Sequence, residues 1–153
     1  MTTPNLASEL PQRVNHDAYP GAYLRGILER TKTIAMVGAS PEPFRPSNGV
    51  MRYLQRQGYR VIPVNPYFAG QTLHGERVYA SLRDIPERID MVNVFRRPDA
   101  VGDAVEDAIA AGAPVVWMQL GIRNDAACAL AEEAGMTVVM NRCVSSEHAR
   151  LMR

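Results

Sequence analysis

The sequence predicts an α/β protein whose core is a doubly wound parallel sheet of five strands. Short apolar runs alternate with segments of helical periodicity along most of the chain. These runs are continuously apolar, which is typical of parallel strands covered on both faces. The first run, residues 33–37, ends at Gly38 and a loop of small residues, and a helical pattern follows. A strand, a small-residue loop and a helix form the first unit of nucleotide-binding folds, so the predicted fold is Rossmann-like.

The first helix is predicted at residues 21–30, where large apolar side chains recur at helical spacing. It is an extra N-terminal helix, which precedes the first strand of the sheet. The first strand, 33–37, is a short apolar run with β-branched residues. The loop after it contains three prolines, which exclude helix until Ser47 or Asn48, both typical N-cap residues. The second strand, 59–64, follows the glycine that ends this helix.

Residues 67–77 are predicted to be a polar loop, which a brief strand and one helical turn follow. The third strand is predicted at 90–95. The next helix begins at Pro98, because proline suits the first helical position. The remaining elements alternate: strand 114–118, helix 124–134, strand 136–140 and helix 146–151. Numbered along the chain, the five strands are expected in the order 3-2-1-4-5.

Composition limits the class of protein. The chain has 153 residues, 46% hydrophobic and 22% charged, which favours one domain at 19–153 after a flexible tail at 1–18. The net charge of +1 and the lack of interleaved basic and aromatic residues argue against nucleic-acid binding. No apolar run is long enough to span a membrane. Two distant cysteines and no recognisable signal sequence predict a reduced, cytoplasmic protein, and no group of residues has metal-ligand spacing.

The candidate binding residues follow the predicted strands, because ligands of an open α/β sheet bind beyond the carboxyl ends of the strands. They are Gly38, Ala39 and Ser40; Val64, Asn65 and Pro66; Phe95, Arg96 and Arg97; Gln119, Leu120 and Gly121; and Asn141, Arg142 and Cys143. Arg45 in the first loop extends this set. Small residues let phosphate oxygens approach the N–H groups at a helix start, and arginine donates to phosphate as a planar fork. The set predicts an anionic nucleotide, unless Arg96 and Arg97 are only a solvated pair.

A nicotinamide dinucleotide fits this pattern less well. The first loop reads Gly38 to Pro43 without the G-x-G-x-x-G pattern. The second strand ends in Asn65-Pro66, where a carboxylate would hold the ribose hydroxyls of NAD. For these reasons an NAD(P)-linked oxidoreductase or redox sensor is kept only as an alternative hypothesis.

A series of segments carries a more specific pattern: Val37–Ser40, Arg45–Ser47, Val50–Leu54, Gly58–Pro66, Phe95–Pro98, Val116–Asn124, and Asn141–Cys143 with Glu147-His148. In order and spacing they resemble the small stand-alone CoA-binding proteins. These are similar in fold to the N-terminal CoA-binding domain of the succinyl-CoA synthetase alpha subunit. The resemblance covers roughly residues 20–153 and implies that the cofactor is coenzyme A.

The resemblance also implies roles for the candidate residues. The phosphates of CoA would be met by Gly38, Ala39 and Ser40 together with Arg45 and Ser47. Val64, Asn65 and Pro66 would lie beside the adenosine. Phe95, Arg96 and Arg97 would line the opposite wall, near the pyrophosphate or the start of the pantetheine arm. Gln119, Leu120 and Gly121 would border the exit of that arm.

The expected function is binding of CoA or an acyl-CoA by a sensing or regulatory protein without catalysis of its own. The chain is too short to hold the phosphohistidine domain of the synthetase, so ligase chemistry is not carried over. The alternative is an enzyme acting on a CoA thioester through Cys143 or His148. Cys143 is either a packed, inert thiol or a reactive one whose pKa Arg142 lowers. A homodimer or an unidentified protein partner stays open.

Overall fold

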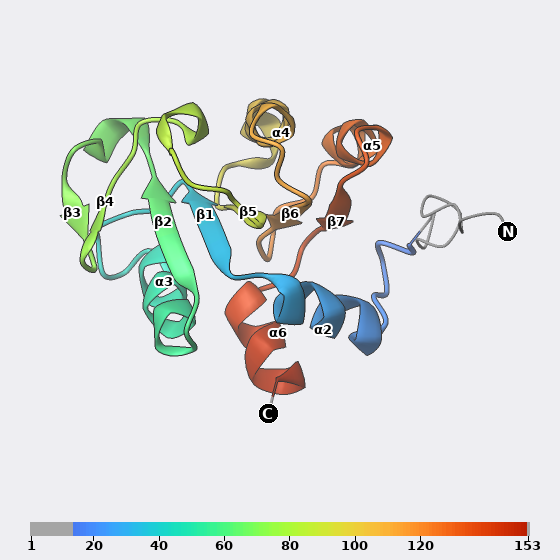
Figure 1. The fold of residues 1–153 in the computed structure, drawn as a ribbon. Coiled ribbons are helices and arrows are strands. Elements are labelled where there is room, and N and C mark those ends of the chain that lie inside the picture. Colours follow the sequence, from blue (N-terminus) through green and yellow to red (C-terminus); the bar gives the residue numbers. More distant parts are fainter. Residues whose placement is uncertain (1–13, 153) are drawn as a thin grey trace, which may run out of the picture.

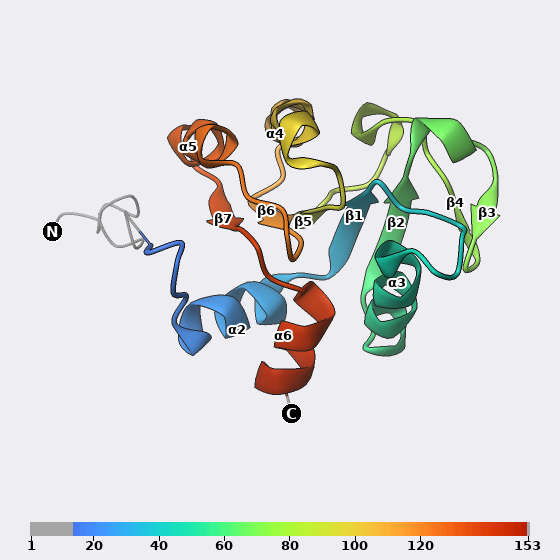
Figure 2. The same ribbon diagram turned by 180° about the vertical axis from the view of Figure 1, so that it is seen from behind.

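The computed structural model describes residues 14–152 and contains a five-stranded parallel sheet between two layers of helices (Figure 1). The strands of the sheet are β1 (Thr33–Val37), β2 (Arg60–Val64), β5 (Met91–Val94), β6 (Val115–Met118) and β7 (Thr137–Val139). One face is covered by α2 (Gly21–Arg30), α3 (Pro46–Arg56) and α6 (Val144–Leu151), the other by α4 (Val101–Ala110) and α5 (Asp125–Glu133). Figure 2 shows the same layers from behind. The predicted fold class is confirmed.

The core consists of two apolar layers, one on each face of the sheet. In β1, Ile34 and Met36 pack in the layer with α2, α3 and α6, whereas Ala35 and Val37 pack in the layer with α4 and α5. Every residue of β5 and β6 is buried. Burial on both faces explains why these strands read as unbroken apolar runs in the sequence.

The predicted strand order, 3-2-1-4-5, is wrong. The observed order is β2-β1-β5-β6-β7, which is 2-1-3-4-5 when the five strands are numbered along the chain. The outer edge of β2 is occupied by Tyr79, whose N–H donates to the carbonyl of Pro63 at 3.0 Å and whose carbonyl accepts from Asn65 N–H at 2.9 Å. The third strand therefore pairs with the other edge of β1, where Met91 faces Ile34.

The connection between β2 and β5 contains more structure than the predicted loop. It has 3₁₀ turns η1 (Pro66–Phe68) and η2 (Leu82–Asp84) and a small hairpin of β3 (Thr72–Leu73) and β4 (Glu76–Arg77). The hairpin lies beside β2 (Figure 1). Helix α3 begins at Pro46, before the predicted Ser47 or Asn48, because Arg45 has the extended N-cap conformation and proline suits the first turn. A turn η3 (Pro98–Ala100) precedes α4, and Pro98 opens that turn.

The predicted tail, residues 1–18, lies mostly outside the described residues. Of its described part, His16 and Asp17 contact the region of α5: His16 lies beside Glu132, and Asp17 forms an ion pair with Arg123. Within the described residues, no helix combines the length and the apolarity that crossing a membrane requires.

Candidate functional site

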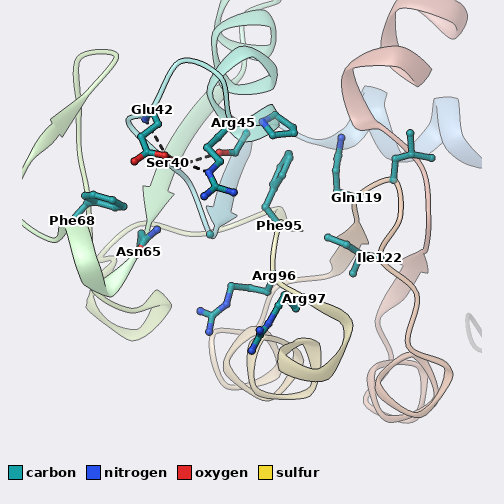
Figure 3. Close-up of a pocket in the computed structure, with 14 residues that line it drawn as sticks. Ser40, Glu42, Arg45, Asn65, Phe68, Phe95, Arg96, Arg97, Gln119 and Ile122 are labelled. Atoms are coloured by element: carbon teal, nitrogen blue, oxygen red, sulfur yellow. Dashed lines mark hydrogen bonds and ion pairs between the residues drawn. The ribbon is translucent and has the colours of Figure 1, made fainter.

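A cavity of about 490 Å³ opens where β1, β2, β5 and β6 end. Its size is typical of small-molecule sites. Figure 3 shows the loop after β1 on one wall and the segment after β5 facing it. Most of the predicted site residues line it: Gly38, Ser40, Arg45, Ser47, Asn65, Phe95, Arg96, Arg97, Gln119 and Leu120. The parallel strands thus bring their terminal residues to one cavity, as the sequence predicts.

The other predicted site residues do not line this cavity: Ala39, Val64, Pro66, Gly121, Asn141, Arg142 and Cys143. Ala39 is buried in the apolar layer that contains α2, α3 and α6. Val64 and Pro66 line a smaller cavity of about 220 Å³, which adjoins the first because Arg96 lines both. Gly121 holds the turn after β6 by donating its N–H to Asn141 Oδ1 at 2.7 Å.

Sequence reasoning missed four residues that line the cavity: Glu42, Pro46, Phe68 and Ile122. Pro46 and Ile122 are each next in sequence to a predicted residue, so adjacency was the available signal. Glu42 and Phe68 come from a proline-containing loop and a 3₁₀ turn, whose paths no periodic pattern specifies.

Gly38 ends β1 with a positive φ of 91°, a conformation that favours glycine. A Cβ atom added there would lie 2.7 Å from the carbonyl oxygen of Phe95, well inside van der Waals contact. The glycine is therefore required because the ends of β1 and β5 approach closely, which is a requirement of the fold independent of any ligand.

The backbone N–H groups of the loop after β1 are already engaged within the protein. Gly38 and Ala39 donate theirs to the carbonyl of Val64, at 2.9 and 3.3 Å. Ser40 donates its N–H to Ser47 Oγ at 3.0 Å, and Ser40 Oγ accepts from the N–H of Glu42 at 3.1 Å. Both serine oxygens act as acceptors, so each hydroxyl keeps its proton for donation to a ligand.

Helix α3 directs its amino end at the cavity. Pro46 has no N–H, and the N–H of Ser47 has no acceptor among the described residues. Such free donors, together with the helix dipole, attract anions. The start of α3 is therefore suited to a phosphate group.

Asn65 fixes the position of the loop after β1. Its Nδ2 donates to the carbonyl oxygen of Ala39 at 2.9 Å, and its Oδ1 accepts from the N–H of Tyr67 at 3.0 Å. Both polar atoms of the side chain thus have protein partners. Asn65 lines the cavity but acts in this structure as a positioning residue for the loop.

Three arginines border the cavity and differ in how far their charge is balanced. Nε of Arg45 lies 3.3 Å from the Glu42 carboxylate, and Nε of Arg97 lies 3.6 Å from that of Asp99. Arg96 has neither an ion pair nor a hydrogen bond from its side chain within residues 14–152. A guanidinium without a carboxylate partner in a cavity is available to a phosphate, which it can bind through two parallel hydrogen bonds.

Gln119 joins the cavity to the start of α6. It is 5% exposed, and its Oε1 accepts from the side-chain amide of Asn93 at 3.3 Å and from the N–H of Val144 at 3.4 Å. Asn93 is fully buried in β5 and also donates to the carbonyl of Trp117 at 3.1 Å. This buried network fixes the orientation of Gln119.

Cys143 is the N-cap residue of α6 and lies next to the cavity lining without being part of it. Burial raises the pKa of its thiol, but hydrogen bonds to the sulfur, from Ser145, Ser146 and Gln119, outweigh burial and hold the pKa below its ordinary value. The predicted cause was Arg142. That explanation is wrong, because Arg142 lies over the ring of Tyr19 and donates to backbone carbonyls.

His148 lies away from the candidate site. It is buried between α3 and α6, where its Nδ1 is 2.9 Å from the hydroxyl of Tyr53, and burial lowers its pKa. It borders a cavity of about 520 Å³ near the amino end of β1, which Thr33 and Arg60 also line. Arg60 is paired there with Glu76 and Glu87. A catalytic role for His148 at the cavity beyond the carboxyl ends of the strands has no geometric support.

The sequence of the chain matches a known family. Residues 32–149 match the family described as the CoA binding domain. The uncharacterised protein YneT of Bacillus subtilis (strain 168) is 40% identical over 128 residues, which are 84% of this chain and 93% of that protein.

Solved structures show the same fold. A hypothetical protein from Pyrococcus horikoshii OT3 has a TM-score of 0.86 and 43% identity, over 92% of this chain and 97% of that chain. The dinucleotide forming acetyl-coenzyme A synthetase 1 of Ca. Korarchaeum cryptofilum, in complex with phosphate and ADP, has a TM-score of 0.60 and 26% identity. That likeness spans 70% of this chain and 25% of the synthetase chain.

The family match covers most of the chain, and the small relatives are matched over nearly their whole length. This agrees with the resemblance found in the sequence. The chain belongs to the CoA-binding domain family.

Proposed function

We propose that this protein binds coenzyme A, or an acyl-CoA, in the cavity where β1, β2, β5 and β6 end. One observation carries the proposal. The guanidinium of Arg96, which has no partner in the described part of the chain, borders the same cavity as the hydroxyls of Ser40 and Ser47 and the amino end of α3. CoA carries a pyrophosphate and a 3′-phosphate, and these groups need several donors and positive charge. Membership in the CoA-binding domain family supports the same ligand.

The proposal assigns a role to each part of the cavity. Ser40, Ser47 and Arg96 bind phosphate oxygens, with Arg45 and Arg97 adding positive charge. The adenosine lies toward the smaller adjoining cavity, which Val64 and Pro66 line. The pantetheine arm leaves past Phe95, Gln119 and Leu120, where an apolar ring, an amide and an aliphatic side chain border the path.

We propose further that binding, rather than catalysis, is the role of this site. Within residues 14–152, the cavity lining contains no histidine or cysteine, and its one carboxylate, Glu42, is paired with Arg45. General acid–base and nucleophilic catalysis need such groups within hydrogen-bond reach of the reacting atoms. The protein would then sense CoA or regulate a partner, in the cytoplasm as the sequence predicts.

A second candidate function has one supporting observation. Cys143 has a lowered pKa and lies beside Gln119, which borders the proposed path of the pantetheine arm. A thiolate there would attack an acyl-CoA thioester, so that the acyl group passes to Cys143 and CoA leaves as its thiolate, or it would attack the disulfide of oxidised CoA and release one CoA thiolate. Thioester turnover by the wild-type protein that is lost in Cys143→Ala would establish this alternative, and CoA binding without turnover would exclude it.

Native mass spectrometry of freshly purified protein tests the proposed ligand. An added mass equal to CoA or an acyl-CoA, released by acid and not by a reductant, is the expected result. Competition then compares CoA with dephospho-CoA and NAD. Displacement of CoA by NAD at lower concentration, or failure of the bare protein to take up CoA, would contradict the proposal.

A further inference from the structure

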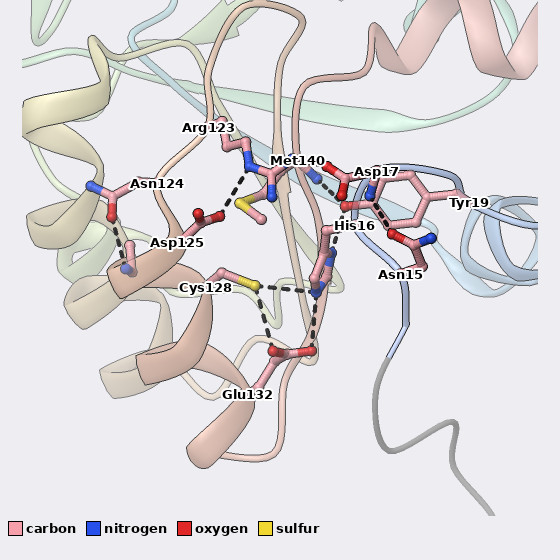
Figure 4. Close-up of polar contacts among 11 residues, drawn as sticks. Asn15, His16, Asp17, Tyr19, Arg123, Asn124, Asp125, Cys128, Glu132 and Met140 are labelled. Atoms are coloured by element: carbon pink, nitrogen blue, oxygen red, sulfur yellow. Dashed lines mark hydrogen bonds and ion pairs between the residues drawn. The ribbon is translucent and has the colours of Figure 1, made fainter.

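Three side chains of types that bind metals meet beside helix α5, away from the cavity. Cys128 and Glu132 lie one turn apart on α5, and His16 reaches them from the segment before α2 (Figure 4). Nε2 of His16 is 3.3 Å from Sγ of Cys128 and 3.3 Å from Oε2 of Glu132. Sγ of Cys128 is 3.5 Å from Oε1 of Glu132. One ligand atom from each residue lies within 4.8 Å of the other two.

We propose that His16, Cys128 and Glu132 bind a divalent zinc ion. Thiolate, imidazole and carboxylate are the three ligand types that zinc takes in proteins. With zinc bonds of about 2.3 Å to sulfur and about 2.0–2.2 Å to nitrogen and oxygen, tetrahedral geometry separates the ligand atoms by about 3.3–3.6 Å. The Cys128 Sγ to His16 Nε2 separation of 3.3 Å is close to these values. Glu132 meets His16 through Oε2 and Cys128 through Oε1, so its carboxylate must turn until one oxygen faces both ligand atoms.

The histidine is held in position by a second set of contacts. Its Nδ1 lies 2.6 Å from the hydroxyl oxygen of Tyr19, and that oxygen accepts from the N–H of Met140 at 2.8 Å. Metal-binding histidines are generally fixed in this way through the ring nitrogen that does not touch the metal. Tyr19 thereby directs Nε2 toward Cys128 and Glu132.

Zinc binding requires a defined change of protons. The Cys128 thiol loses its proton to solvent, and the Sγ–Zn bond takes the place of the S–H bond. The imidazole keeps one proton, now on Nδ1, which donates to the Tyr19 oxygen and frees the Nε2 lone pair for the metal. Thiolate and carboxylate together carry two negative charges, which balance the charge of the ion. Glu132 is exposed, so a water molecule can fill the fourth position.

The donor set favours zinc over magnesium and calcium. Magnesium and calcium prefer six or more oxygen ligands, whereas a thiolate selects softer metals. None of the three residues lines the proposed CoA cavity. The ion would therefore act independently of CoA and fasten the segment that precedes α2 to α5.

Cobalt(II) titration of the untagged protein tests the site, because cobalt replaces zinc in tetrahedral sites and reports thiolate ligation. The expected result is one cobalt per chain, with a thiolate-to-cobalt charge-transfer band in the near ultraviolet, and zinc should abolish that band. Cys128→Ala should lose the band, and Cys143→Ala, the matched control, should keep it. His16→Gln and Glu132→Gln should each weaken binding at least about tenfold, whereas Glu133→Gln should not.

Two results would overturn the proposal. One is the absence of a charge-transfer band from the reduced wild-type protein. The other is a band that survives Cys128→Ala or that depends on Cys143. Circular dichroism checks the fold of each variant, and if Cys128→Ala does not fold, the partly exposed His16→Gln and the exposed Glu132→Gln decide the question. Zinc should also raise the Tm of the wild-type protein and leave that of His16→Gln unchanged.

Discussion

The side-chain amide of Asn65 donates to the carbonyl oxygen of Ala39 at 2.9 Å, and so joins the end of β2 to the loop after β1. Asn65→Asp keeps an oxygen for the N–H of Tyr67 but loses the donor to Ala39. We expect it to lower the free energy of unfolding by about 1–3 kcal/mol and to weaken CoA binding, because the loop loses its anchor. Urea unfolding and calorimetric titration measure the two effects. Unchanged values of both would remove Asn65 as a positioning residue.

Alanine substitutions at Gly38 and Gly58 separate two costs of an added Cβ atom: the steric contact with Phe95, which occurs only at Gly38, and the backbone strain of a positive φ, which occurs at both. Both have positive φ, 91° and 96°, but an added Cβ meets the carbonyl oxygen of Phe95 at Gly38 and nothing within 4 Å at Gly58. Gly58→Ala should cost about 1–2 kcal/mol of unfolding free energy from its φ alone. Gly38→Ala should cost more, because β1 and β5 must also move apart. Equal losses in urea unfolding would show that the contact with Phe95 is relieved without cost.

His148 should make stability depend on pH. Burial lowers its pKa below the ordinary value of 6.5, so the unfolded chain takes up a proton at higher pH than the folded protein does. Its contribution is present in full above pH 6.5 and is lost as pH falls from there toward the folded pKa. His148→Asn should therefore lose less Tm than the wild type between pH 7.5 and about 5.

The control for this pH effect is His74→Asn, because burial also lowers the pKa of His74. That variant shows how much of the pH dependence belongs to the second histidine. Parallel Tm profiles for the wild type and His148→Asn would mean that the pKa of His148 is the same in the folded and unfolded states.

The sequence predicted the five strands of the parallel sheet well, because burial on both faces gives each of them a continuous apolar run. The strand order was missed, although one residue could have decided it. Pro63 lies in β2 and cannot donate a ladder hydrogen bond, which confines its strand to the edge of the sheet. In the order 3-2-1-4-5 the second strand would be interior. Tyr79 confirms the reason, since it occupies the side of β2 that Pro63 leaves without a donor.

The site could be predicted to the level of segments but not of atoms. Parallel strands bring their carboxyl ends together, so most of the residues that follow the strands line one cavity. Which donors remain free depends on contacts between segments distant in sequence. Gly38 and Ala39 donate their N–H groups to the carbonyl of Val64, so these groups are not free for a ligand. The hydroxyls of Ser40 and Ser47, which line the cavity, remain as donors. The cluster of His16, Cys128 and Glu132 was missed because His16 lies 112 residues before Cys128 in the sequence.

Arg96 is the residue on which CoA binding in this cavity depends most, because it is the cavity arginine without a carboxylate partner among residues 14–152. Arg96→Ala should weaken CoA binding by about 1.5–3 kcal/mol, which is about 10–150-fold in Kd, if its guanidinium binds a phosphate. Arg88→Ala is the matched control, since Arg88 is 87% exposed and does not line the cavity.

Calorimetric titration of CoA into the wild type, Arg96→Ala and Arg88→Ala is the most direct test. We predict one CoA per wild-type chain, the same affinity for Arg88→Ala, and the stated loss for Arg96→Ala. A wild-type protein that takes up no CoA, or an Arg96→Ala variant that binds CoA as tightly as the wild type, would contradict CoA binding at this cavity.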